Sequence, residues 1–173
     1  MLLNLRSLQG AHEHIEKRYE PSAFPAAEGD TFRVIEPVSM SFDVDRQETN
    51  RFRVSGRLAG AVELNCSRCL EPFRLPVETT FDLRYAPRTE NVGEGEREVD
   101  EDDLSTAFYD DEQIDLGQLM IEQFQLVVPM KPLCREDCRG LCPQCGTNLN
   151  TGSCTCSAQW ADPRFDALKR LKA

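Results

Sequence analysis

Residues 51–85 read RFRVSGRLAGAVELNCSRCLEPFRLPVETTFDLRY, and this stretch decides the fold. Apolar and polar side chains alternate at residues 52–56, 61–64 and 81–85, which is the period-two pattern of half-buried strands. The pair Cys66-x2-Cys69 lies among these segments, where a hairpin tip is expected. We therefore expect a sheet with one turn that two cysteines hold together.

Alternation of the same kind occurs upstream, at residues 32–34 and 40–44. Residues that break regular structure separate the expected strands, namely Gly29, Pro37, Asn50, Gly60 and Pro87. An antiparallel sheet or small open barrel is the natural product of such a series. We expect residues 1–27 to add an edge strand or a docking arm.

One helix is predicted at about residues 115–128. Asp115 can cap its first turn, with Gln118 placed to complete a capping box, and Pro129 ends it. An apolar stripe predicts that the helix packs on the sheet, and its members are Leu116, Leu119, Met120, Phe124 and Val127. A second, short helix is expected to begin at Asp162-Pro163. The fold class predicted is therefore α+β.

The charge is concentrated in one part of the chain. The 173 residues carry a formal charge of −10, and residues 90–115 hold 12 acids against Arg97 alone, a net of −11. We expect an acidic loop at about residues 88–113. Direct wrapping of nucleic acid is disfavoured, because such binding depends on Lys and Arg. A basic protein partner is easier to accommodate.

No segment predicts insertion into a membrane or export. The longest uncharged apolar run is residues 126–130, far short of the roughly 20 residues that a spanning helix needs. The first residues lack a basic region, a long apolar core and a cleavage site. We expect a cytoplasmic protein without a membrane partner.

Eight cysteines point to metal rather than disulfides, because the cytosol is reducing and eight thiolates make two tetrahedral sets of four. We assign the first site to Cys142, Cys145, Cys154 and Cys156, and the second to Cys66, Cys69, Cys134 and Cys138. Pro143 and Gly146 suit a zinc knuckle, so two zinc ions are expected. The partition stays open, since Cys134 or Cys138 could exchange with a neighbour, and iron is the alternative metal. We expect residues 1–133 to form a β-rich domain and residues 134–173 a Cys-rich zinc-binding tail.

Enzyme readings find little support. His12 and His14 are the only histidines, and His14-x-Glu16 followed by C-x2-C resembles a zinc deaminase signature only faintly, because that signature needs Pro before the first Cys. We expect both histidines to be surface residues. The sequence contains neither a Gly-rich phosphate loop nor a nucleophile elbow. A zinc with four thiolates has no open position, so it stabilises rather than catalyses. We expect no enzymatic activity and no small-molecule substrate.

Three segments together resemble one family. Residues 65–73, NCSRCLEPF, are similar to the CxRCLxPF element of the YceD family of bacterial and plastid proteins. Residues 114–134 are similar to that family's helix and its exit. Residues 138–150, CRGLCPQCGTNLN, resemble the Cys-rich tail of many members. The likeness covers roughly residue 30 to the C-terminus.

The resemblance implies a role in accumulation of large-subunit ribosomal RNA, and so in assembly of the large ribosomal subunit. The expected partner is a large-subunit precursor or a basic ribosomal protein. Two alternatives stay open: a thiol redox switch or holdase that releases zinc on oxidation, and a zinc-ribbon module for transcription or RNA binding.

Overall fold

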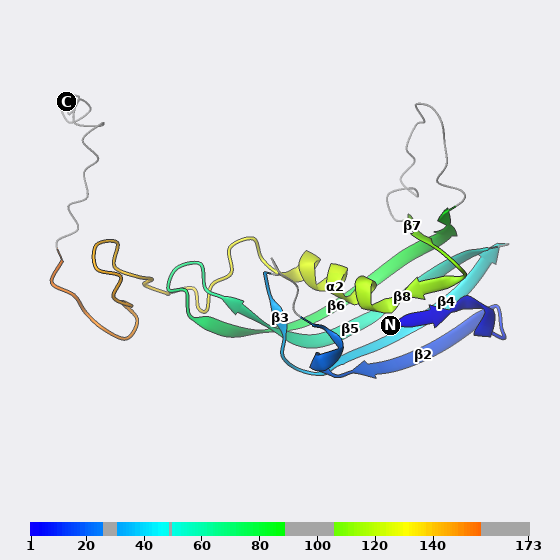
Figure 1. Ribbon diagram of the computed structural model, residues 1–173, viewed down its shortest axis with the longest axis horizontal. Helices are drawn as coiled ribbons and strands as arrows, with labels where there is room; N and C mark the ends of the chain where they lie inside the picture. The colour runs from blue at the N-terminus through cyan, green and yellow to red at the C-terminus, as the bar shows by residue number, and fades with distance from the viewer. Residues whose placement is uncertain (26–30, 49, 89–105, 157–173) are drawn as a thin grey trace, which may run out of the picture.

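The computed structural model describes residues 1–25, 31–48, 50–88 and 106–156 (Figure 1). Its elements, in chain order, are β1 Leu2–Asn4, the 3-10 turn η1 Leu5–Ser7, β2 His12–Tyr19, the 3-10 turn η2 Pro21–Ala23, β3 Arg33–Val34, β4 Val38–Glu48, β5 Arg51–Asn65, β6 Pro72–Pro87, β7 Thr106–Tyr109, β8 Gln113–Asp115 and the helix α2 Leu116–Val127. The predicted terminal helix at Asp162-Pro163 lies outside the described residues.

A six-stranded sheet dominates the fold. Its path is β2-β4-β5-β6-β7, with β3 paired to the distal part of β5, and β1 and β8 form a separate two-stranded sheet. The sheet is long because β5 and β6 stay in register from Phe52↔Tyr85 to Asn65↔Pro72. The path does not close on itself among the described strands, so the fold is α+β with open sheets.

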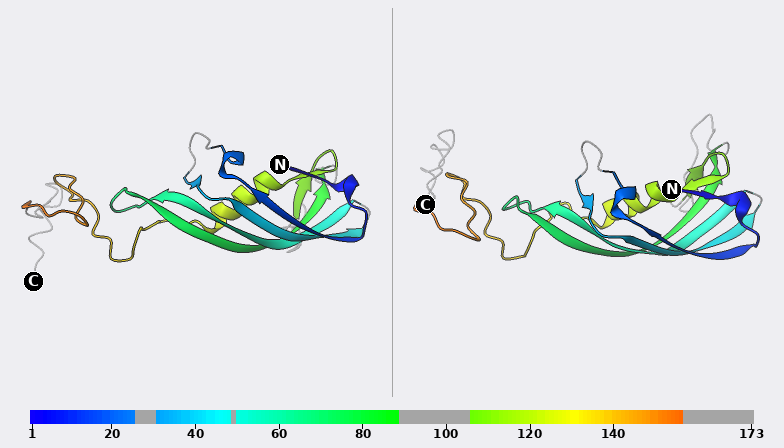
Figure 2. Two further views of the ribbon diagram at one scale, coloured as in Figure 1. Left: turned by 90° about the horizontal axis from the view of Figure 1, so that it is seen from below. Right: turned by 60° about the horizontal axis from the view of Figure 1, so that its bottom comes forward.

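The helix α2 lies on the concave face of the sheet, as two further views show (Figure 2). Asp115 caps it, accepting from the N–H groups of Gly117 at 2.8 Å and Gln118 at 3.3 Å. The predicted stripe faces the core: Leu116, Leu119, Met120 and Phe124 are buried, and Val127 packs at the margin. The Gln118 side chain donates to Glu122 rather than back to the cap, so the box is half formed.

Two sequence predictions about strand ends are wrong. Gly60 does not break the sheet, because β5 continues through it; a Cβ there would lie 3.3 Å from Val38 and 3.5 Å from Phe124, so glycine makes room for the helix. Strand β6 starts nine residues before the expected 81–85 segment, at Pro72. Among the described strands, β7 pairs with β6 only from Arg84 onward, so Pro76 lies where β6 is an edge and is tolerated there.

The expectation of an acidic loop at 88–113 needs correction at its C-terminal end. Residues 106–109 form β7, which runs parallel to β6, and Gln113 begins β8. The parallel pair also departs from the all-antiparallel sheet that we expected. The acidic residues around these strands obscure the strand pattern in the sequence. The strands are held by contacts distant in the chain: Tyr109 is buried, and its hydroxyl donates to the Asn50 carbonyl at 2.8 Å.

The N-terminal residues supply an edge strand, as one of the two alternatives predicted. Strand β2 pairs with β4 along its whole length, from His12↔Asp45 to Tyr19↔Val38. Within the described ranges, no helix has the length and apolar character needed to cross a membrane.

Candidate metal centres

The hairpin between β5 and β6 ends in a tight turn that carries Cys66 and Cys69. The Cys66 N–H donates to the Glu71 carbonyl, and the Leu70 N–H donates to the Cys66 carbonyl, both at 2.9 Å. Leu70 takes a left-handed conformation, with φ of +61°, to close this turn. The two sulfurs are thereby turned to one side of the tip.

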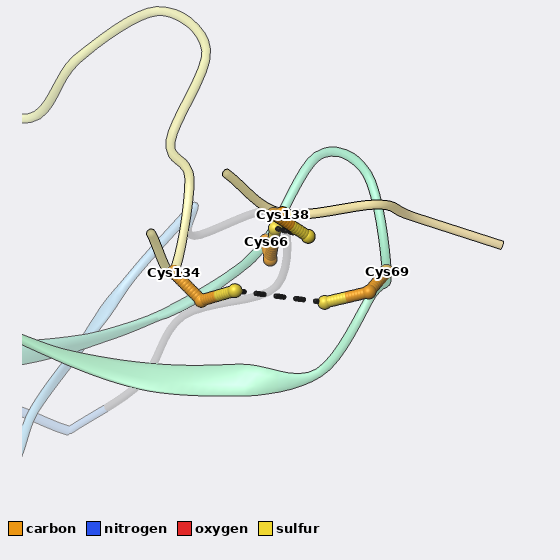
Figure 3. Close-up of side chains that lie close together, drawn as sticks. All are labelled: Cys66, Cys69, Cys134 and Cys138. Atoms are coloured by element: carbon orange, nitrogen blue, oxygen red, sulfur yellow. Dashed lines mark hydrogen bonds between the residues drawn. The ribbon is translucent and has the colours of Figure 1, made fainter. Parts of the chain in front are cut away.

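The chain that follows α2 returns to this tip. The Ser67 N–H donates to the Pro132 carbonyl at 2.8 Å, which brings Cys134 and Cys138 beside the turn. The sulfurs of Cys66 and Cys138 lie 3.7 Å apart, and those of Cys69 and Cys134 lie 3.8 Å apart (Figure 3). We call these four residues the hairpin cluster. Three of them are buried, and Cys134 is half-buried.

The tail repeats the same turn. The Cys142 N–H donates to the Thr147 carbonyl at 2.8 Å, and the Gly146 N–H donates to the Cys142 carbonyl at 2.9 Å. Gly146 has φ of +72° and holds the position that Leu70 has in the hairpin turn. We call the group that this turn helps to form the tail cluster: Cys142, Cys145, Cys154 and Cys156. Cys145 and Cys156 are exposed, so the tail cluster is the more open of the two.

The donor sets fit a tetrahedral thiolate site. In each cluster the four sulfurs lie within 4.8 Å of one another. Four sulfurs at about 2.3 Å from one zinc ion would stand roughly 3.8 Å apart, and the two sulfur pairs of the hairpin cluster, at 3.7 and 3.8 Å, match this spacing. Four thiolates leave no open coordination position, so a metal here would hold chain segments together and would not activate water.

The thiol pKa values show how strongly the sulfurs depend on one another. Burial works to raise the pKa of Cys66, but N–H donors from Cys134, Cys69 and Arg68 outweigh it and lower that pKa to about 6. Burial, and then the neighbouring sulfurs, raise the pKa of Cys134 to about 12. Once one thiolate forms, like charge opposes the next, and a dication would remove that conflict.

The tail cluster shows the same division. Hydrogen bonds from Thr147 lower the pKa of Cys145 to about 6. The hydrogen bond with Cys145, followed by burial, raises the pKa of Cys156 to about 12. In both clusters the thiol pKa values are thus divided between lowered and raised ones, as expected of sulfurs close enough to share one cation.

Arg68 fastens the hairpin cluster to the tail. Its guanidinium donates to the carbonyls of Cys138 at 2.8 Å and Glu136 at 3.1 Å, and its own carbonyl accepts from Leu141 N–H at 3.1 Å. Gly140 is needed at this contact, because a Cβ there would lie 3.0 Å from the Arg68 carbonyl oxygen. The spacing of the cysteines gives no signal for this role of Arg68.

All eight predicted ligands thus fall into two groups of four, and the groups have the membership assigned from sequence. The hairpin cluster draws two sulfurs from each side of the expected boundary at residues 133–134. The histidines lie elsewhere, exposed on β2: His12 contacts Asp45, and His14 contacts Asp43, each at 2.7 Å. Most of the acidic segment, residues 89–105, lies outside the described residues.

Comparison with known proteins gives one consistent family. The family model described as large ribosomal RNA subunit accumulation protein YceD matches residues 54–172. The large ribosomal RNA subunit accumulation protein YCED homolog 1, chloroplastic, of Zea mays is 32% identical over 69% of this chain and 48% of its own length. Its Arabidopsis thaliana namesake is 26% identical over 79% of this chain and 49% of its own. An uncharacterized protein of Mycobacterium tuberculosis is 38% identical over 56% of this chain and 44% of its own.

The chain spans about half the length of the curated relatives it matches. No solved structure matches it. The family model covers more than half of the chain, including the β5–β6 hairpin, α2 and all eight cysteines, so the chain belongs to the YceD family.

Proposed function

We propose that this protein is a non-enzymatic factor in the accumulation of large-subunit ribosomal RNA. The observation that carries the proposal is the family match over residues 54–172, since the family description and the named plant relatives all refer to that process. In this proposal the protein acts on a precursor of the large ribosomal subunit, or with one of its basic proteins.

Zinc is the metal we propose for both clusters, one ion in each. Support comes from the sulfur-only donor sets and from the spacing of the sulfurs. The ions would join the hairpin tip to a metal-binding tail at residues 134–173 and leave the β-rich part, residues 1–133, with its own core.

A cleft supports a basic partner. The strands β7 and β8 beside it lie at the end of the sheet away from the hairpin tip (Figure 1). The volume of the cleft is about 320 Å³, and it lies between β7, β8 and the start of α2. Four carboxylates and one guanidinium line it; they belong to Asp110, Asp111, Asp115, Glu122 and Arg88.

Apolar and aromatic side chains line this cleft beside the carboxylates. Burial raises the pKa of Tyr85 to about 12, and the charges of Glu122 and Asp115 contribute to the rise. Leu2 and Phe108 also line the cleft and are exposed. Asp110 already pairs with Arg88 at 2.7 Å, and Asp115 pairs with the N-terminal ammonium at 3.5 Å. A Lys- or Arg-rich segment would find counter-charge chiefly at Asp111 and Glu122, and contact for its aliphatic stems on the apolar side chains.

Sedimentation tests the proposed function. Lysates that contain the tagged protein are run through sucrose gradients at low and high salt, and the fractions are probed for precursor and mature rRNA. Co-migration with immature large-subunit particles, lost at high salt, is the expected result. The proposal would be contradicted if the protein stayed at the top of the gradient and if rRNA also matured normally in cells from which the protein had been deleted.

Neutralising the cleft tests the partner. The triple variant Asp110→Asn, Asp111→Asn and Glu122→Gln removes three charges and leaves the helix cap Asp115 in place. We expect the variant to lose salt-sensitive co-migration. The matched control Asp43→Asn, Asp45→Asn and Glu16→Gln removes three charges from β2 and β4, and it should behave as the unchanged protein does.

A redox switch is the second candidate, because Cys145 and Cys156 are exposed while most of the hairpin cluster is buried. Mild peroxide would then release one zinc ion, unfold the tail and produce holdase activity. Indifference of the bound metal to peroxide would leave a structural role only.

A further inference from the structure

A loop of the tail cluster reaches the hairpin cluster. Asn150 lies between Cys145 and Cys154, in the segment that joins the two halves of the tail cluster. Its Nδ2 donates to the Cys138 sulfur of the hairpin cluster at 3.3 Å. One side chain therefore belongs to the loop of one cluster and hydrogen bonds a ligand of the other.

The amide of Asn150 is held in this orientation by separate partners. Its Oδ1 accepts from the Arg139 N–H and from the Arg135 guanidinium, both at 2.8 Å. Its backbone N–H donates to Asn148 Oδ1 at 3.0 Å, and the Leu149 N–H donates to the Gly140 carbonyl at 2.9 Å. With the oxygen occupied by two donors, the nitrogen faces the sulfur, and its second N–H donates to Asn148 Oδ1 at 3.0 Å.

Such a donor matters most for a thiolate. An N–H group that points at a ligating sulfur offsets part of its charge and fixes its direction, and partners of this kind typically change metal affinity by 10–100-fold. The loop that carries Asn150 is closed at its two ends by tail-cluster cysteines, so a metal in that cluster restricts where Asn150 can lie.

We propose that the two clusters bind metal cooperatively through Asn150. Occupancy of the tail cluster places the Asn150 amide against Cys138 and tightens metal binding in the hairpin cluster. By linkage, a filled hairpin cluster tightens the tail cluster to the same extent. Asn150 is a positioning residue, and the proposal rests on metal binding by both clusters, which is part of the proposed function.

The experiment measures Zn²⁺ affinity by chelator competition on the full chain under reducing conditions. The hairpin site is assigned by its loss in the double variant Cys69→Ser, Cys134→Ser. We expect Asn150→Ala to weaken the hairpin site about 10–100-fold. Emptying the tail cluster with Cys154→Ser and Cys156→Ser should weaken it by a similar factor.

Combination of the changes separates coupling from local damage. When Asn150→Ala and the tail-cluster variant are combined, the second change should add little, because both remove the same contact. Asn150→Asp keeps the oxygen that Arg135 and Arg139 use and loses the donor to sulfur, so it should also weaken the hairpin site. Thr151→Ala, a change in the same loop, is the control and should leave the affinity unchanged.

Each other outcome is decisive. Full additivity of the two changes, or a hairpin site that is indifferent to the tail-cluster variant, would overturn the coupling and leave the proposed function intact. A chain that binds no zinc at either cluster would overturn the coupling together with the proposed zinc centres. Thermal unfolding of the sheet, recorded for every variant, identifies any change that acts through the fold as a whole.

Discussion

The attachment of the tail to the hairpin tip should depend on metal. Residues 134–138 must be ordered there, at a cost of about 1–2 kcal/mol each, or roughly 5–10 kcal/mol together. Four hydrogen bonds of 2.8–3.1 Å cross this junction, from Ser67 to Pro132, from Leu141 to Arg68, and from Arg68 to Glu136 and Cys138, beside a longer one of 3.5 Å from Asn148 to Glu71. At about 1 kcal/mol each, the four shorter bonds stabilise the attached tail by roughly 4 kcal/mol.

The ordering cost exceeds the hydrogen-bond contribution by a few kcal/mol. We therefore predict that without metal the tail is detached from the hairpin tip most of the time. The binding free energy of a structural zinc ion is about 10–16 kcal/mol in small peptides, which exceeds this difference. We therefore expect removal of zinc, or the double variant Cys69→Ser, Cys134→Ser, to speed tryptic cleavage after Arg135 and Arg139 by at least roughly tenfold.

The sheet should survive this change. Its core forms a hydrophobic cluster separate from the cysteines, so the thermal midpoint of sheet unfolding should stay within a few degrees. Ser67→Ala is the matched control, because Ser67 contributes a backbone N–H to the junction. Cleavage at equal rates with and without zinc would show that the hydrogen bonds alone hold the tail, and the reasoning would be refuted.

Three further changes test other parts of the structure. Gly56→Ala should lower the free energy of unfolding in urea by about 3 kcal/mol, because the new Cβ would lie 2.6 Å from the Phe42 Cα of the paired strand; an unchanged urea midpoint would rule out this close approach. Leu70→Gly should raise the free energy of unfolding of the zinc-loaded protein by about 0.5–1 kcal/mol, because relief of left-handed strain exceeds the entropy of glycine, and a clear loss would contradict the shared turn. The hydrogen bond to Asp43 raises the pKa of His14. The stabilisation that protonated His14 gives the fold is therefore full below about pH 6.5 and is lost as the pH rises through the raised pKa. The urea midpoints of His14→Gln and the unchanged protein should differ more at pH 5.5 than at pH 9.

Local signals explain what could be predicted from the sequence. The alternation at residues 52–56 and 81–85 lies in β5 and β6, and the cap at Asp115 starts α2. These features depend on residues close together in the chain. The C-x2-C spacing likewise predicted two turns, because the turn itself brings both sulfurs to one side.

Tertiary contacts explain what could not be predicted. Gly60 looks like a strand breaker in the sequence, and its role shows only in the contact with the helix. Strand β7 follows an acidic segment without strand pattern, and it is stabilised by pairing with β6, some 20 residues upstream in the chain. The grouping of Cys134 with Cys66 depends on the path of the chain after Pro129. The bond from Asn150 to Cys138 has no signal in the spacing of the cysteines.

The central claim is that eight cysteines form two zinc centres that consist only of sulfur ligands. X-ray absorption at the zinc edge, together with the metal content of the purified full chain, tests it most directly. We predict two zinc ions per chain, each with four sulfurs at about 2.3 Å. Iron in place of zinc, fewer than two ions, or nitrogen and oxygen in the coordination shell would contradict the account.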